Sequence, residues 1–449
     1  MYIPHTPAER DEMLRVVGKK SLEELFADIP EKFRFPVLDL PEPVSEMEVE
    51  EQFRDLSNAN FACDEIVCFL GAGVYNHYSP AAVDMLLRRG DFFTAYTPYQ
   101  PEISQGTLQA IFEFQSLIAN LTGMDVSNAS HYDGATAAGE ACLSAYHHFR
   151  GKRPKIILSG AVHPHYRETV HTYLCGFEDI EIVEAGLIED PTYPKKLADM
   201  VDDQTALVLV QYPDFLGRVF NFTELGKVVH ENGALLAVSA NPIALGLLTP
   251  PSEFGADFVV GEGQPLGIPM SFGGPYLGFF ATRDELIRKI SGRLVGETID
   301  AKERRGYVLT LTAREQHIRR EKATSNICTN QGLLALAATI YLSLLGKNGL
   351  REVAELCFHK AHYAAQLINK IPGFKVDDNS VFFNEFTVQC PKDPLQINEY
   401  LINEGVLGGL PLGDFYPDLQ NHMLIAVTEK NSKESIDLLC ELLEEVAND

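Results

Sequence analysis

The spacing of hydrophobic residues changes near residue 61. Beyond that point, short apolar runs alternate with amphipathic segments whose apolar residues recur at helical spacing. The runs are rich in β-branched residues and lack a regular polar alternation, which is typical of strands buried on both faces. The pattern therefore predicts an α/β fold with a mostly parallel sheet covered by helices. The predicted strands are residues 66–70, 155–159, 180–183, 206–211, 234–239, 257–260 and 276–281.

Residues that commonly begin and end helices mark the segments between these strands. Ser79-Pro80 and Ser104 are typical helix starts, and Gly123 and Gly233 are typical helix stops. After residue 330 the order of elements changes to that of an α+β domain. The predicted longer helices are residues 104–123, 134–150, 164–174, 222–232, 330–346, 350–370, 395–404 and 433–446, and the later strands are 374–376, 383–389 and 423–427.

Residues 1–60 follow a third pattern, which predicts a helical arm. Residues 6–9 read Thr-Pro-Ala-Glu, a capping-box signature with proline at the first helical position. Residues 21–24 repeat the capping pattern, the prolines in 36–44 predict an extended connector, and 45–58 predict an acidic helix. We therefore expect three domains. They are the N-terminal helical arm at 1–60, a large α/β domain at 61–330, and a linking helix with a small C-terminal α+β domain at 331–449.

Composition and charge exclude several classes of function. The 449 residues include 63 acidic and 37 basic side chains, for a net charge of −26. Such an acidic chain is unsuited to bind nucleic acid or an anionic membrane surface. The N-terminus lacks a basic segment followed by an apolar run, and the apolar stretch 333–345 is too short to cross a bilayer. The eight cysteines are scattered without any CxxC pair, so we expect reduced thiols, no metal site and a cytoplasmic location.

Three short motifs allow a ligand-binding and a purely structural interpretation. The Gly71 to Gly73 turn follows a strand, but a third glycine is missing at Asn76, which favours a close backbone turn over a dinucleotide fingerprint. Small residues at 130–138 lead into a helix and predict either a phosphate site at the helix start or tight packing there. His163 and His165 flank a proline, which disfavours a shared metal ion and leaves ring stacking on a planar ligand or a satisfied loop histidine.

Two further segments suggest an interface. Residues 94–106 are rich in tyrosine, proline and polar groups without helical or strand period, so they predict a loop suited to an interface or a ligand lid. Residues 302–322 carry seven basic and three acidic side chains, a local reversal of the overall charge. This segment predicts either a surface for a phosphate or an acidic protein, or a solvated helix face with i,i+4 ion pairs.

The sequence contains the motifs FLGAG at 69–73, YTPYQPEISQG at 96–106, YDGAT at 132–136 and ATSNICTNQ at 323–331. Taken together, these motifs resemble one protein family, the P protein of the glycine cleavage system. The resemblance covers essentially the whole chain, and the length is similar to that of the alpha subunit (subunit 1) of the family's two-chain form. It implies fold-type I of the enzymes that use pyridoxal 5'-phosphate (PLP). It also implies decarboxylation of glycine on PLP and transfer of the aminomethyl group to the lipoyl arm of the H protein.

The residues that would hold PLP are missing from the matching positions. A PLP enzyme needs a lysine for the Schiff base and an acid facing the pyridine nitrogen. The turn that carries a His-Lys pair in the family's catalytic subunit reads Gln264-Pro265 here, and the strand that should carry the aspartate has Val238 and no acid. We therefore expect no catalytic residue in this chain, and PLP on a partner beta subunit.

The resemblance also implies which residues complete the partner's site and steer the H protein. Two alternatives remain: an autonomous PLP enzyme that uses Lys227 or Lys289, and a scaffold that only stabilises the beta subunit. The expected site-completing residues are Tyr96, Tyr99, Glu102, Ser104, Gln105, Ser325, Asn326 and Thr329, and the expected steering residues are Arg304, Arg305, Arg314, Arg319 and Arg320.

Overall fold

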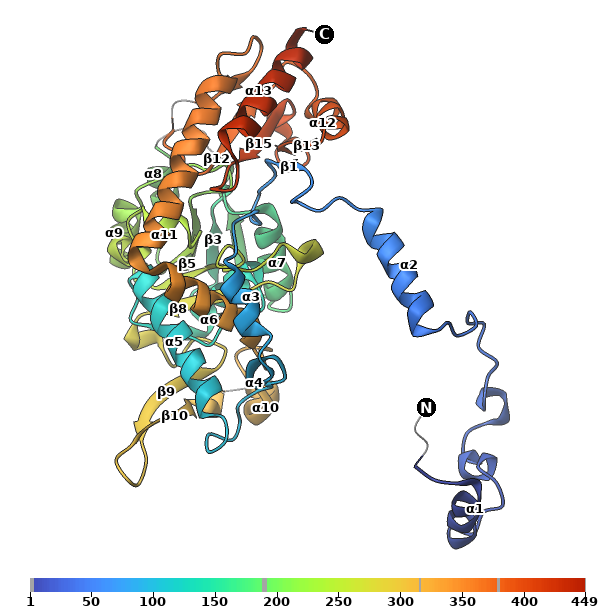
Figure 1. The fold of residues 1–449 in the computed structure, drawn as a ribbon. Helices are drawn as coiled ribbons and strands as arrows, with labels where there is room; N and C mark the ends of the chain where they lie inside the picture. The colour runs from blue at the N-terminus through green and yellow to red at the C-terminus, as the bar shows by residue number, and fades with distance from the viewer. Residues whose placement is uncertain (1–3, 188–191, 315, 378–379, 449) are drawn as a thin grey trace. The chain divides into compact units, whose positions relative to one another are not determined.

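A computed structural model describes residues 4–187, 192–314, 316–377 and 380–448 of the chain (Figure 1). The chain divides into two compact units, Met1–Phe61 and Ala62–Asp449. The first unit contains helices α1 (Pro7–Val16) and α2 (Glu46–Asn58) and the short 3₁₀ turns η1 (Glu23–Phe26) and η2 (Glu31–Phe33).

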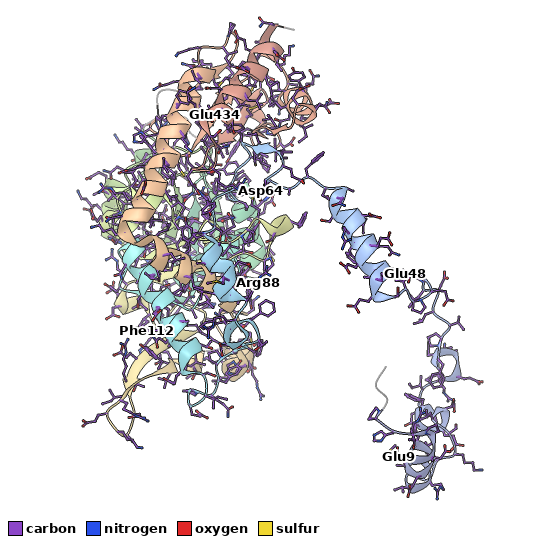
Figure 2. All side chains as sticks on the ribbon, viewed as in Figure 1. Glu9, Glu48, Asp64, Arg88, Phe112 and Glu434 are labelled. Carbon is purple, nitrogen blue, oxygen red and sulfur yellow. The ribbon has the colours of Figure 1, made fainter. Side chains whose placement is uncertain are left out.

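Both long helices of the first unit begin with a capping box, as the sequence predicts for the first of them. Thr6 and Glu9 exchange hydrogen bonds at the start of α1, and Ser45 and Glu48 do so at the start of α2. Figure 2 labels Glu9 and Glu48 in these first turns. The repeated capping pattern at residues 21–24 predicts a longer helix, and this prediction is wrong, because only the four-residue η1 forms there. None of the η1 residues is buried, so tertiary packing does not stabilise a longer helix before Pro30.

A seven-stranded sheet in the order β2-β8-β7-β6-β5-β3-β4 forms the centre of the second unit. Strands β3 to β7 pair in parallel, whereas β8 is antiparallel to both of its neighbours, β7 and β2. This arrangement confirms the mostly parallel sheet that the sequence predicts. The bounds are β2 (Val126–Ser127), β3 (Lys155–Leu158), β4 (Glu181–Glu184), β5 (Thr205–Tyr212), β6 (Leu235–Ala240), β7 (Phe258–Glu262) and β8 (Gly278–Thr282).

Helices cover both faces of this sheet, which explains why its strands lack polar alternation. Along β5, Leu207 and Leu209 pack with the helix pair α6 (Gly134–His148) and α7 (Pro164–Leu174) on one face. Val208 and Val210 pack on the other face with α5 (Gln105–Thr122), α9 (Thr223–Glu231) and the first part of α11. Shorter helices connect these layers: α3 (Ala81–Leu87), α4 (Gly90–Phe93) and α8 (Tyr193–Ala198).

Helix α11 (Gly332–Ile368) joins the sheet region to the C-terminal part, where two separate helices are predicted. It is long and apolar enough to cross a membrane, but it breaks at Gly346, where φ is 57°. Ala337, Ala338 and Tyr341 belong to the main hydrophobic core, as in the core helix of a globular domain. The break at Gly346 lies where the sequence places the boundary between the two predicted helices.

The C-terminal part contains a four-stranded antiparallel sheet in the order β11-β12-β15-β14. One predicted strand of the large domain joins this region instead, because β1 (Val67–Cys68) pairs with β13 (Val406–Leu407). The remaining elements are β11 (Lys375–Val376), β12 (Glu385–Gln389), α12 (Pro394–Asn403), β14 (Leu410–Pro411), β15 (His422–Ala426) and α13 (Lys433–Asn448).

A β-hairpin of β9 (Leu294–Ile299) and β10 (Arg305–Thr310) occupies part of the basic segment (Figure 1). The alternative of one solvated helix face over residues 302–322 is therefore wrong. Only short turns follow the hairpin, namely η7 (Thr312–Arg314), α10 (Gln316–Arg319) and η8 (Arg320–Lys322). Paired strands bury part of this segment, as Tyr307 at 5% exposure illustrates.

Candidate functional site

A small cavity lies at the carboxyl ends of β6 and β7, where open α/β sheets generally bind ligands. Its walls include Ser239 and Asn241 after β6, Glu262 and Pro265 after β7, and Glu385 of the C-terminal sheet. Its volume is about 40 Å³, which is room for a few water molecules. The enclosed space at this position is therefore small.

The carboxylate of Glu262 occupies the start of helix α6. Its Oε2 accepts from the Gly134 N–H at 2.9 Å, and its Oε1 accepts from the Gln264 and Leu277 N–H groups at 2.9 and 3.0 Å. Burial raises the pKa of this carboxyl to about 8. A second donor of the first turn, the N–H of Thr136, is bound by the Asp133 side chain at 2.7 Å. The chain itself therefore supplies acceptors to two donors of the helix start, which supports the structural interpretation of this motif.

Gln264 and Pro265 follow β7, at the turn where the family resemblance implies a Schiff-base lysine. The Gln264 amide accepts from the Tyr75 N–H at 3.0 Å and donates to the carbonyls of Tyr75 at 3.1 Å and Ile268 at 2.8 Å. This side chain is 1% exposed and holds the Tyr75 segment in place. Lys227 is exposed on α9 and pairs with Glu224 at 2.7 Å. Lys289 is also exposed, and both lysines lie outside the cavity wall.

The Gly71 to Gly73 turn brings the backbone against Glu385. The Ala72 N–H donates to Glu385 Oε1 at 2.6 Å, and the Tyr75 hydroxyl donates to Oε2 at 2.7 Å. Burial raises the pKa of Glu385 to about 7. A Cβ atom at Gly71 would overlap the Glu385 carboxylate, so glycine is needed for this close approach. The sequence alone does not identify Glu262 or Glu385, because neither follows a recognisable motif.

His163 is satisfied within the chain. Its Nε2 donates to the Ala72 carbonyl at 2.8 Å, and its Nδ1 accepts from the His165 N–H at 3.1 Å. Its ring stacks on Tyr166 at a centroid distance of 4.9 Å. Burial lowers the pKa of this imidazole to about 4, so it is neutral at pH 7. Of the two interpretations left open for this residue, the structure supports the satisfied histidine.

Arg293 joins the two loops that contain most of the expected site-completing residues. Its Nη2 donates to the Tyr99 hydroxyl at 2.9 Å, and its Nη1 donates to Thr329 Oγ1 at 2.9 Å. Arg293 lies just before the β9–β10 hairpin and is only 2% exposed. No motif in the sequence identifies it. Beside it, a cavity of about 120 Å³ is lined by residues of the first loop, α5 and α11, including Tyr96 and Thr329.

The other expected residues of these loops have different environments. Gln105 accepts from the Tyr307 N–H at 2.8 Å and donates to its carbonyl at 2.9 Å, so it fastens α5 to the hairpin. Ser325 donates to Glu140 Oε1 at 2.8 Å, and burial raises the pKa of Glu140 to about 7. Ser104 precedes α5 without a side-chain cap hydrogen bond. The side chains of Tyr96, Glu102 and Asn326 are exposed.

The arginines of the basic segment are partly neutralised. Arg304 pairs with Asp300 at 2.7 Å, and Arg305 pairs with Glu297 at 2.9 Å, both within the hairpin. Arg319 and Arg320 are exposed on the short turns that follow. The side chain of Arg314 lies outside the described residues.

One group of residues of metal-binding types lies together outside this site. His77 Nδ1 is 2.7 Å from Glu429 Oε2, and the Cys357 thiol donates to the same oxygen at 3.4 Å. The Glu429 Oε1 atom accepts from the Tyr78 N–H at 2.6 Å. These direct hydrogen bonds link α11, the Tyr75 segment and the turn after β15, and this link accounts for the grouping.

Comparison with known proteins assigns the chain to one family. The family model of the glycine cleavage system P-protein matches residues 1–443. A protein of Thermomicrobium roseum named probable glycine dehydrogenase (decarboxylating) subunit 1 is 56% identical over 99% of both chains. A protein of the same name in Desulforamulus reducens is 51% identical over 98% of both chains.

Solved structures agree with this assignment. An inhibitor-bound glycine decarboxylase (P-protein) of the glycine cleavage system has a TM-score of 0.90 and 43% identity, with 99% of this chain and all of the other chain covered. The sphingosine-1-phosphate lyase of Burkholderia pseudomallei, at 15% identity and a TM-score of 0.67, shares the fold over 93% of this chain and 94% of its own. These similarities confirm the expected fold-type I architecture. The chain belongs to the glycine cleavage system P-protein family.

Proposed function

We propose that this chain is the subunit of glycine dehydrogenase (decarboxylating) that does not hold PLP. The observation that carries the proposal is the cavity after β6 and β7. A phosphate would need the helix start that Glu262 occupies, and a Schiff base would need an amine where Pro265 stands. The volume of about 40 Å³ supports this proposal, because it leaves little room for PLP.

The activity accordingly belongs to a complex. A beta subunit supplies PLP, the complex decarboxylates glycine, and the aminomethyl group passes to the lipoyl group of the H protein. This chain contributes the loops around Arg293, where Tyr96 and Asn326 are exposed and therefore free to contact the partner. Gln105 and Ser325 act indirectly by holding these loops. Ser104 stands at the start of α5, and Glu102 lies on the exposed surface of the first loop.

The proposal extends to the domains, the H protein and the cell compartment. We place the domains at 1–60, 61–330 and 331–449. Because Arg304 and Arg305 are paired within the hairpin, Arg319 and Arg320 are the stronger candidates to attract an acidic H protein. The complex is cytoplasmic and acts without nucleic acid or membrane.

The decisive experiment compares glycine decarboxylation by this chain, by the beta subunit and by their mixture. We expect activity only in the mixture. Activity of this chain alone would support the autonomous enzyme with Lys227 or Lys289, and full activity of the beta subunit alone would refute the proposal.

Variants of the exposed loop residues separate a site-completing subunit from a scaffold. Tyr96→Ala and Asn326→Ala should lower the activity of the mixture without weakening subunit association. Tyr78→Ala is the matched control, because Tyr78 is also an exposed tyrosine, at 60%, on a different segment. Unchanged activity in both loop variants would favour the scaffold.

The steering role has a test of its own. Reversing Arg319 and Arg320 to glutamate should raise the KM for the H protein and weaken its dependence on salt. The same reversal at the exposed Arg88 and Arg89 is the control. An unchanged salt dependence in the first variant would contradict the steering role.

A further inference from the structure

The buried guanidinium of Arg293 has no negatively charged partner within the part of the chain that the structure describes. Its three hydrogen bonds go to the neutral oxygens of Tyr99, Thr329 and Asn330, at 2.9, 2.9 and 3.3 Å. Its Nε–H is buried without an acceptor. Burying a charge that is not paired is costly, so proteins seldom retain one without a use.

A second buried arginine makes the contrast clear. Arg218 is 5% exposed and lies against the Asp214 carboxylate at 2.7 Å. Asp214 offsets that charge, whereas no carboxylate among the described residues pairs with Arg293. The difference indicates that the countercharge of Arg293 comes from outside the chain.

The two hydroxyls bound to Arg293 can each donate a hydrogen bond to a ligand. Each accepts one N–H from the guanidinium, and each still has its own hydrogen to donate. Neither hydroxyl donates to another group among the described residues. A cation behind a hydroxyl polarises its O–H bond, so Tyr99 and Thr329 present two strengthened donors.

The location of these donors gives an anion access to them. Tyr99 is 52% exposed, and its ring lies under the guanidinium at 5.3 Å. Thr329 and Asn330 line the cavity of about 120 Å³ beside the first loop. A small oxyanion can therefore reach the Tyr99 hydroxyl from the open surface and the Thr329 hydroxyl at the cavity wall.

We propose that the hydroxyls of Tyr99 and Thr329, backed by Arg293, form a binding site for an oxyanion, either a carboxylate or a phosphate. This inference deepens the proposed function and rests on it in one respect: the oxyanion belongs to the ligand of the beta subunit, either the carboxylate of glycine or the phosphate of the cofactor. In either case this chain supplies the hydrogen-bond donors and the positive charge.

The first experiment does not depend on the proposed function. The thermal midpoint of the full chain is measured with acetate and with inorganic phosphate, against chloride at equal ionic strength. We expect at least one oxyanion to raise the midpoint of the wild type and of Thr329→Ser, and to lose this effect in Thr329→Val and Tyr99→Phe. Tyr78→Phe is the matched control. General salt effects cancel between the wild type and Thr329→Val, because threonine and valine side chains have nearly the same size and shape. An equal effect in Thr329→Val and Thr329→Ser would overturn the site.

The second experiment uses the complex and identifies the source of the oxyanion. The KM for glycine and the dissociation constant of PLP are measured for the same variants. A rise of about tenfold in the KM alone assigns the site to the carboxylate of glycine, and a similar rise in the PLP constant alone assigns it to the phosphate. If neither constant changes in Thr329→Val and Tyr99→Phe, the inference is wrong even though the complex is active. If the mixture is inactive while the oxyanion effect is present, the proposed function fails and the site stands.

Discussion

Removing the carboxyl group of Glu262 tests whether this side chain stabilises the fold and blocks an anion site at the start of α6. Glu262→Ala would strip the acceptor from three main-chain donors, the N–H groups of Gly134, Gln264 and Leu277. Because burial raises the pKa of Glu262 to about 8, the group acts largely as a neutral acceptor at pH 7. Each lost bond then costs about 1–1.5 kcal/mol, so the variant should lose about 3–5 kcal/mol of unfolding free energy.

The same change should create a new property. With the carboxyl group gone, the start of α6 is free to bind an external anion at its exposed N–H groups. Inorganic phosphate should therefore stabilise Glu262→Ala more than it stabilises the wild type. Glu262→Gln keeps one acceptor oxygen, so its unfolding free energy should lie between those of the wild type and Glu262→Ala.

Urea unfolding followed by far-ultraviolet circular dichroism, with and without phosphate, measures both effects. Glu253→Ala is the matched control, because Glu253 is an exposed glutamate that precedes the same strand, β7. A loss in Glu262→Ala below about 1 kcal/mol would refute the argument, because a side chain holding three buried donors must be worth more than that. An equal effect of phosphate on variant and wild type would refute the claim that Glu262 blocks an anion site.

Three other predictions concern buried groups. Burial raises the pKa values of Glu140 and Glu385 from 4.5 to about 7. Between pH 5 and 7 the folded chain therefore binds more protons than the unfolded chain, and its unfolding free energy should fall as the pH increases. The urea midpoint across this range measures the fall, and Glu140→Gln should make the midpoint less dependent on pH. Since burial lowers the pKa of His163 to about 4, its ¹⁵N resonances should show a neutral ring with no titration between pH 5.5 and 8, and a midpoint in that range would contradict its buried contacts. Gly217→Ala should destabilise the chain strongly, because φ is +84° and the new methyl group would overlap the main chain of Glu385, whereas Gly176→Ala meets nothing within 4 Å and should be nearly neutral in a thermal melt.

Much of the fold follows from local signals that the sequence carries. Buried β-branched runs predict β3 to β8 to within two residues at each end, and capping residues predict α5 and α7 well. The β9–β10 hairpin is missed, because its strands carry the charged pair Arg305 and Glu297 and gain stability from each other and from Gln105 of α5. The pairing of β1 with β13 is missed as well, since contacts between residues so far apart in the chain leave no periodic pattern.

The candidate site divides in the same way. Gln264 and Pro265 become candidates from the sequence alone, because the family resemblance implies a lysine at that turn. Glu262 and Arg293 cannot, because their roles depend on a cavity wall and on a bond between two distant loops. A lone arginine in an ordinary stretch becomes informative only when its burial and the lack of a countercharge are visible.

The central claim is that this chain has the fold of a PLP enzyme but holds no PLP. A visible absorption spectrum of the purified chain with PLP, followed by borohydride reduction and mass spectrometry, tests it directly. The account predicts no imine band and no added mass on the chain alone, with both on the beta subunit in the mixture. A band that borohydride traps on a specific lysine of this chain would contradict the account, because it would place a working cofactor site where Gln264, Pro265 and Glu262 leave none.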